Sequence, residues 1–163
     1  MKRIAILVLT LVLLSGCSVQ TFETVDDLQD VQAVAQPATL LLDLPEEAAA
    51  MTMQGSSATL YFCGDYDIMV ETLPSGNLNQ TLQTLTGFEK DDLKLMETVR
   101  CGVTCYEGAW SSAGEAGDHV GRVLVLDDNN YHYCITVMAM ADNAGECTPA
   151  WNLLMESAAL AEG

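Results

Sequence analysis

The sequence predicts a single α+β domain in which a mainly antiparallel sheet of about five to seven strands is flanked by two or more helices. Strand-like and helix-like segments follow in the order strands, helix, strands, helix, without the strict alternation of a parallel βαβ fold. Short turn signals join several of the strands as hairpins. The chain has 163 residues and is 50% hydrophobic, which suffices for one buried core.

The beginning of the chain predicts export. A positive start at residues 1–3 precedes residues 4–14, which are apolar except for Thr10. A membrane-spanning helix needs about 20 apolar residues, so this run is too short to cross a membrane. We interpret residues 1–16 as a secretory signal peptide, with a signal anchor that stays uncut as the alternative.

The signal ends in Leu14-Ser15-Gly16-Cys17, which resembles the lipobox of bacterial lipoproteins. That resemblance implies cleavage between Gly16 and Cys17 and attachment of lipid, palmitate included, to Cys17. The expected location is the cell envelope, at the outer face of the cytoplasmic membrane or at an outer membrane if the organism has one. The acyl chains on Cys17 would then attach the protein to the membrane.

Residues 17–36 are polar and acidic, and we interpret them as a tether that follows the lipidated cysteine. A short helix is expected over residues 26–35, ending before Pro37. An acidic tail that binds a partner is the alternative for this segment. The globular domain is expected over residues 37–163.

The first half of the domain predicts three strands and a helix. Thr39–Asp43 is the first strand, and Ala58–Cys63 with Asp67–Leu73 forms a hairpin around residues 64–66. The helix is predicted from an N-cap within residues 75–77 to a C-terminal glycine, Gly87. Leucines at positions 78, 82 and 85 give it one apolar face.

The second half predicts a meander and a closing helix. Leu93–Trp110 is long enough for two strands or for one strand bent at a bulge on Gly102. A further hairpin around an Asp/Asn turn is expected to pair His119–Leu126 with Tyr131–Ala141. The first of these two strands is apolar on both faces, which is typical of a central strand. Thr148 is the predicted cap of the last helix, with Pro149 at its first position. The buried stripe of that helix is expected to contain Trp151, Leu154, Met155 and Ala158.

This order of elements resembles the PsbP-like α/β/α sandwich. The similarity covers residues 39–160 and comprises a first strand with the sequence LDLP, a central helix, a long meander and a closing helix that carries a tryptophan. It implies an accessory or binding role rather than catalysis.

Charge excludes some classes of partner. The chain has 6 Lys+Arg and 23 Asp+Glu, for a formal net charge of −17. Nucleic-acid binding is excluded, because it needs clustered cations to neutralise phosphates. A basic protein or a cationic ligand is the partner that such a charge favours. Arg122 lies in an apolar strand, where its charged end is expected to reach out to solvent or to meet an acid. An ion pair with an acid is the interpretation, and an anion site is the alternative.

Five cysteines remain beyond Cys17, an odd number, so at least one is unpaired in a monomer. Buried thiols are one interpretation, because free cysteine in an apolar strand behaves as a small hydrophobic residue. Disulfides, for example between Cys105 and Cys134, and a metal or catalytic role are the alternatives. The five are Cys63, Cys101, Cys105, Cys134 and Cys147.

Candidates for chemistry are few. His119, His132 and Cys134 lie on hairpin partners and are candidates for a metal site, although strand alternation is the favoured explanation for the last two. No motif of a hydrolase, a zinc protease or a P-loop occurs, so we expect no cofactor and no enzymatic activity. The sequence therefore predicts a non-enzymatic, lipid-anchored binding module. The alternative is an extracytoplasmic metal-binding protein or enzyme that uses these three residues.

Overall fold

The computed structural model describes residues 36–52 and 57–161. The predicted signal peptide, the expected lipidation site Cys17 and nearly all of the expected tether, with its predicted helix over residues 26–35, lie outside the described residues. Within the described part, no helix has both the length and the apolar character that a membrane span requires.

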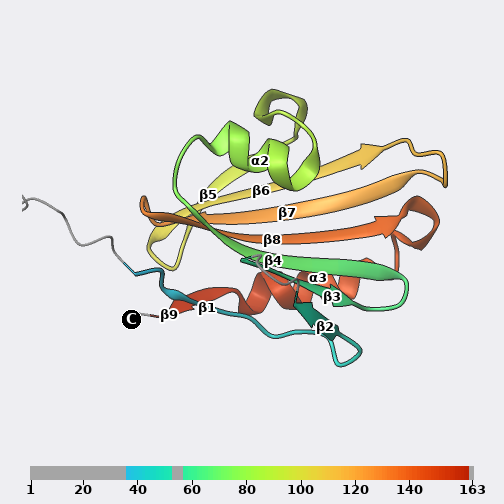
Figure 1. The fold of residues 1–163 in the computed structure, drawn as a ribbon, viewed down its shortest axis with the longest axis horizontal. Helices are drawn as coiled ribbons and strands as arrows, with labels where there is room; N and C mark the ends of the chain where they lie inside the picture. The colour runs from blue at the N-terminus through green and yellow to red at the C-terminus, as the bar shows by residue number, and fades with distance from the viewer. Residues whose placement is uncertain (1–35, 53–56, 162–163) are drawn as a thin grey trace, which may run out of the picture. The chain divides into compact units, whose positions relative to one another are not determined.

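The α+β architecture is confirmed. Seven strands form one antiparallel sheet in the order β2-β3-β4-β8-β7-β6-β5, and β1 pairs with β9 in a separate ribbon (Figure 1). The large sheet contains β2 (Ala49–Thr52), β3 (Ala58–Phe62), β4 (Tyr66–Pro74), β5 (Met96–Arg100), β6 (Val103–Ser112), β7 (His119–Asp127) and β8 (Tyr131–Met140). The ribbon contains β1 (Thr39–Leu41) and β9 (Ala159–Ala161), and short 3₁₀ turns lie at η2 (Lys90–Asp92) and η3 (Ala141–Asn143).

Three hairpins account for most of the sheet. The predicted β3–β4 and β7–β8 pairs are confirmed, and the second turns at Asn129, whose φ is 71°. The segment at 93–110 forms two strands, and the predicted bulge at Gly102 is wrong. Cys101 and Gly102 have φ of 52° and 78° and form a two-residue turn between β5 and β6. Turns with two left-handed residues match the twist of paired strands, which explains a glycine at this position.

The central helix, α2 (Leu78–Thr86), is confirmed with both of its predicted ends. The side chain of Asn77 accepts a hydrogen bond from the Asn79 N–H, which satisfies one of the free donors of the first turn. Gly87 adopts the left-handed conformation with φ 80°, and its N–H donates to the carbonyl of Gln83.

The last helix, α3 (Cys147–Ser157), begins one residue before the predicted cap. Thr148 is therefore not the N-cap; its hydroxyl donates to the carbonyl of Ala144 instead. Glu146 occupies the cap position and makes no capping side-chain hydrogen bond. Trp151 and Leu154, which were predicted for the buried stripe, are 2% and 0% exposed.

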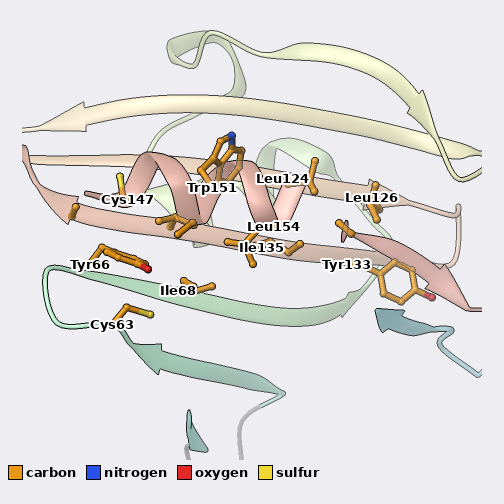
Figure 2. Packing of buried hydrophobic residues seen from close by; sticks show 14 of the residues in the cluster. Cys63, Tyr66, Ile68, Leu124, Leu126, Tyr133, Ile135, Cys147, Trp151 and Leu154 are labelled. Atoms are coloured by element: carbon orange, nitrogen blue, oxygen red, sulfur yellow. The ribbon is translucent and has the colours of Figure 1, made fainter. Parts of the chain in front are cut away.

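One apolar cluster lies on each face of the sheet. On one face α3 and the β1–β9 ribbon pack over β4, β8 and β7, and Figure 2 shows Trp151 and Leu154 among the sheet residues Leu124 and Ile135. On the other face α2 and the segment that follows it pack over β7 and β8. Strand β7 lies between β6 and β8 and is covered on both faces, as predicted; its residues 123–126 are fully buried.

Candidate functional site

The structure separates the two histidines that the sequence offered as metal candidates. His119 pairs with Met140 and His132 pairs with Asp127, so the histidines lie at opposite ends of the β7–β8 hairpin. At the usual rise of a strand they are on the order of 25 Å apart. His132 and Cys134 do share the face that α2 covers. Among the described residues, no three histidine, cysteine or acidic side chains come together as a metal site.

His132 is fully buried and is surrounded by polar side chains from α2 and from the hairpin ends. Its Nδ1 lies 2.8 Å from the Thr81 hydroxyl. Its Nε2 lies 3.4 Å from the Ser75 hydroxyl and 3.6 Å from the Asp127 carboxylate. Ser75 also donates to Asp127 over 3.3 Å. This cluster has no local signal in the sequence, because its members come from three separate segments.

The geometry of the His132 cluster differs from that of a hydrolytic triad. In a triad the two ring nitrogens are divided between the nucleophile and the carboxylate. Here Ser75 and Asp127 both lie at Nε2, and the hydroxyl at Nδ1 belongs to Thr81, which is only 8% exposed. The cluster joins the first turns of α2 to the end of the β7–β8 hairpin, and we interpret it as a structural contact.

The thiols of the described residues are free. Cys105 pairs with Leu126 and Cys134 with Val125, which places the two thiols on opposite faces of the sheet. A disulfide between them, which the sequence left open, is therefore excluded by the fold. Burial, with a smaller contribution from the charge of Glu71, raises the pKa of Cys134 to about 12, and burial also raises the pKa of Cys105. Such thiols stay protonated and are poor nucleophiles near neutral pH.

Among the described elements, none covers one part of the sheet on the α2 side, and we call this part the bare face. It consists of Met51, Leu60, Phe62, Asp67 and Met138, from β2, β3, β4 and β8. The helix α2 lies towards the β5–β7 side of the sheet, away from β2 and β3 (Figure 1). Met51, Phe62 and Met138 are 51%, 42% and 44% exposed. Large apolar side chains grouped in this way are typical of a contact surface.

An acidic group lies in the middle of the bare face. Asp67 is paired in register with Phe62 on one side and with Met138 on the other. Burial raises the pKa of this carboxyl, and among the described residues no cation lies within ion-pair distance of it. Asp67 also borders a cavity of about 220 Å³ to which Asp65 and His119 contribute. The bare face therefore combines apolar contact area with an uncompensated carboxylate.

Arg122 occupies the opposite face of the sheet. It is half-buried on β7, and its guanidinium carbon lies 5.7 Å from the centre of the Trp151 ring. The predicted ion pair is wrong for the described residues, where no carboxylate lies within 4.0 Å of this guanidinium. The side chain borders a cavity of about 260 Å³ next to the beginning of α3.

No protein-family model matches the chain, and no curated protein sequence matches it significantly. Solved structures do match. The chain is similar to LpqN of Mycobacterium tuberculosis, which is described as involved in cell envelope biogenesis, with TM-score 0.54 and 10% identity over 78% of this chain and 87% of that one. It is also similar to cyanobacterial PsbP (CyanoP) of Synechocystis, with TM-score 0.51 and 9% identity over 83% of this chain and 99% of that one.

A protein of Bacteroides thetaiotaomicron is similar as well, with TM-score 0.54 and 8% identity over 80% of this chain. The match spans only 48% of that protein. At these identities the likeness concerns the fold alone. The PsbP-like fold that the order of elements predicted is confirmed.

Proposed function

We propose that this protein is a lipid-anchored module of the cell envelope that does no chemistry and binds a basic partner through the bare face. The observation that carries the proposal is the bare face itself, where Phe62 and Met138 flank Asp67. The structural similarity to LpqN, which is described as involved in cell envelope biogenesis, agrees with this location. The anchor rests on the short signal and its Leu14–Cys17 ending.

The expected partner is an amphipathic segment with cationic residues beside an apolar stripe. The chain carries 23 acidic residues and 6 basic ones, so its surface attracts cations over a range that salt limits to about 8 Å at physiological ionic strength. Methionine suits such a surface, since its flexible thioether adapts to different apolar shapes. Membrane headgroups are a poor alternative, because anionic lipids repel an acidic body.

The buried groups support a role without catalysis. The two histidines lie too far apart to act together, and His132 is enclosed by its own hydroxyl and carboxylate neighbours. The thiol of Cys134 is held protonated by its burial. A nucleophile or general base needs access to substrate, which the burial of His132 and Cys134 denies, and the raised pKa of the Cys134 thiol keeps it protonated near neutral pH.

The anchor is tested by mass spectrometry and fractionation of the full-length protein in a bacterial host. The wild type should be found in the membrane fraction with acyl chains on Cys17, and Cys17→Ser should remain an unprocessed precursor. Cys101→Ser, which changes an exposed thiol elsewhere, should be lipidated as the wild type is. An unmodified, secreted wild-type chain would contradict the proposed anchor.

Binding is tested on the full-length protein with two designed helical peptides that share one apolar stripe. The lysine-bearing peptide should bind, and the peptide with glutamate at the same positions should not. Affinity should fall by about tenfold on going from low to high salt. Met138→Lys should abolish binding, whereas Met96→Lys should not, since Met96 is 54% exposed on the edge strand β5 outside the bare face. Equal binding by the two variants, or by the two peptides, would refute the proposed surface.

A further inference from the structure

Arg122 is a cation in an unusual position. It projects from β7 between Ala109 of β6 and Val137 of β8, its register partners on the face that α3 covers. Its guanidinium lies over the ring of Trp151, a residue that Figure 2 shows on the sheet-facing side of α3. A planar guanidinium held over a ring face keeps its in-plane N–H groups available to an acceptor.

The acceptor is missing from the described residues. No carboxylate of that part of the chain lies within 4.0 Å of Arg122, although acidic residues outnumber basic ones by 23 to 6. A half-buried arginine in so acidic a protein would be expected to have an acidic neighbour. Its side chain instead borders a cavity, and the sequence had left an anion site open as the alternative for this residue.

The cavity beside Arg122 has a volume of about 260 Å³ and an otherwise apolar lining. The residues around it are Ala109, Trp110, Val120, Gly121, Arg122, Val137, Ala144 and Cys147. Among these side chains Arg122 is the sole charged group, so the cavity offers one point of positive charge at the edge of an apolar space. This combination of an apolar pocket with one fixed polar group is characteristic of sites for small ligands.

We infer that this pocket binds a small monocarboxylate with an apolar body, such as a short alkyl or aryl acid. The carboxylate would take two parallel hydrogen bonds from Arg122, in the fork geometry that guanidinium and carboxylate share. The apolar body would lie against Val120, Val137 and the first turn of α3. This site is independent of the bare face, because Val137 and Met138 are successive residues of β8 and point to opposite faces.

The probe for this inference is 4-phenylbutyrate, measured by isothermal titration calorimetry on the full-length protein in a non-ionic detergent. Its neutral amide has the same apolar body and controls for partition into micelles. The acid should bind, and the amide should bind about tenfold or more weakly. Inorganic phosphate, which has charge without an apolar body, should not compete.

Two variants locate the site. Arg122→Gln should weaken binding of the acid by about tenfold and leave the weak binding of the amide unchanged. Arg100→Gln removes the other arginine of the domain and should change neither. Ala144→Leu keeps Arg122 and fills the pocket, so it should abolish binding even if Arg122→Gln proves unstable. Equal affinity for acid and amide, full binding by Ala144→Leu or by a folded Arg122→Gln, or no binding at millimolar concentration would overturn the inference.

Discussion

Replacement of Trp151 by alanine tests whether α3 is docked on the sheet as the structure has it. The indole is 2% exposed and packs in the cluster that joins α3 to β7 and β8. Its removal takes a large apolar surface out of the core and leaves a cavity that the neighbouring helix and strands can fill only in part. Replacement of a buried aromatic residue by alanine costs about 3–5 kcal/mol.

Loss of the contact with Arg122 adds to that cost. A cation over an aromatic ring contributes about 0.5–1 kcal/mol at a partly exposed site. Small domains are stable by about 5–15 kcal/mol, so Trp151→Ala should remove a large part of the free energy of unfolding. For a domain of this size the melting temperature should fall by roughly 10–20 °C.

The assay is urea unfolding of the full-length protein followed by far-ultraviolet circular dichroism, which does not depend on the tryptophan that is removed. Trp110→Ala is the matched control, because Trp110 is half-buried at the edge of the other cluster and should cost clearly less. A free energy of unfolding within about 1 kcal/mol of the wild type for Trp151→Ala, or equal losses in the two variants, would refute the docking of α3.

Two further predictions concern buried polar groups. Thr81→Val leaves Nδ1 of His132 without its partner and should lower the free energy of unfolding, measured in urea, by about 1–3 kcal/mol. The control is Thr84→Val, on the exposed side of the same helix, which should change that free energy by less than about 1 kcal/mol. At pH 8 an alkylating reagent should label Cys101 in the native protein and leave Cys134 unmodified, because burial keeps the pKa of Cys134 far above that pH. Peptide mapping that finds Cys134 of the native protein labelled as fast as Cys101 would contradict this expectation.

Elements with a local signal were predictable from the sequence. The helix α2 carries its apolar spacing, its cap at Asn77 and its terminal Gly87 within one short segment. The strand β7 shows its central position through apolar residues on both faces. The beginning of α3 was missed by two residues, because a Thr-Pro pair is a strong local signal for a cap and the observed helix starts at Cys147 without any side-chain cap.

What the sequence did not predict depends on contacts between distant segments. The strands β2 and β9 are short, and β9 gains its conformation by pairing with β1 at the other end of the domain. The His132 cluster is assembled in the same way, since Thr81 lies 51 residues from it in sequence. For Arg122 the sequence favoured an ion pair over an anion site, because the absence of an acid near a given arginine is a property of the fold.

The β1–β9 ribbon has a consequence for the order in which the domain can be completed during biosynthesis. Leu40 pairs with Leu160. Strand β1, the first of the described elements to leave the ribosome, therefore cannot pair until β9, the last of them, has emerged. Until β9 has emerged, Leu40 of β1, which packs against the α3 cluster, lacks its partner strand. Contacts between such distant segments form late, because closing a long loop costs chain entropy before the contacts between its ends can stabilise the fold. The nascent domain therefore stays open at this edge until β9 has left the ribosome, a period in which chaperones and proteases have access to it.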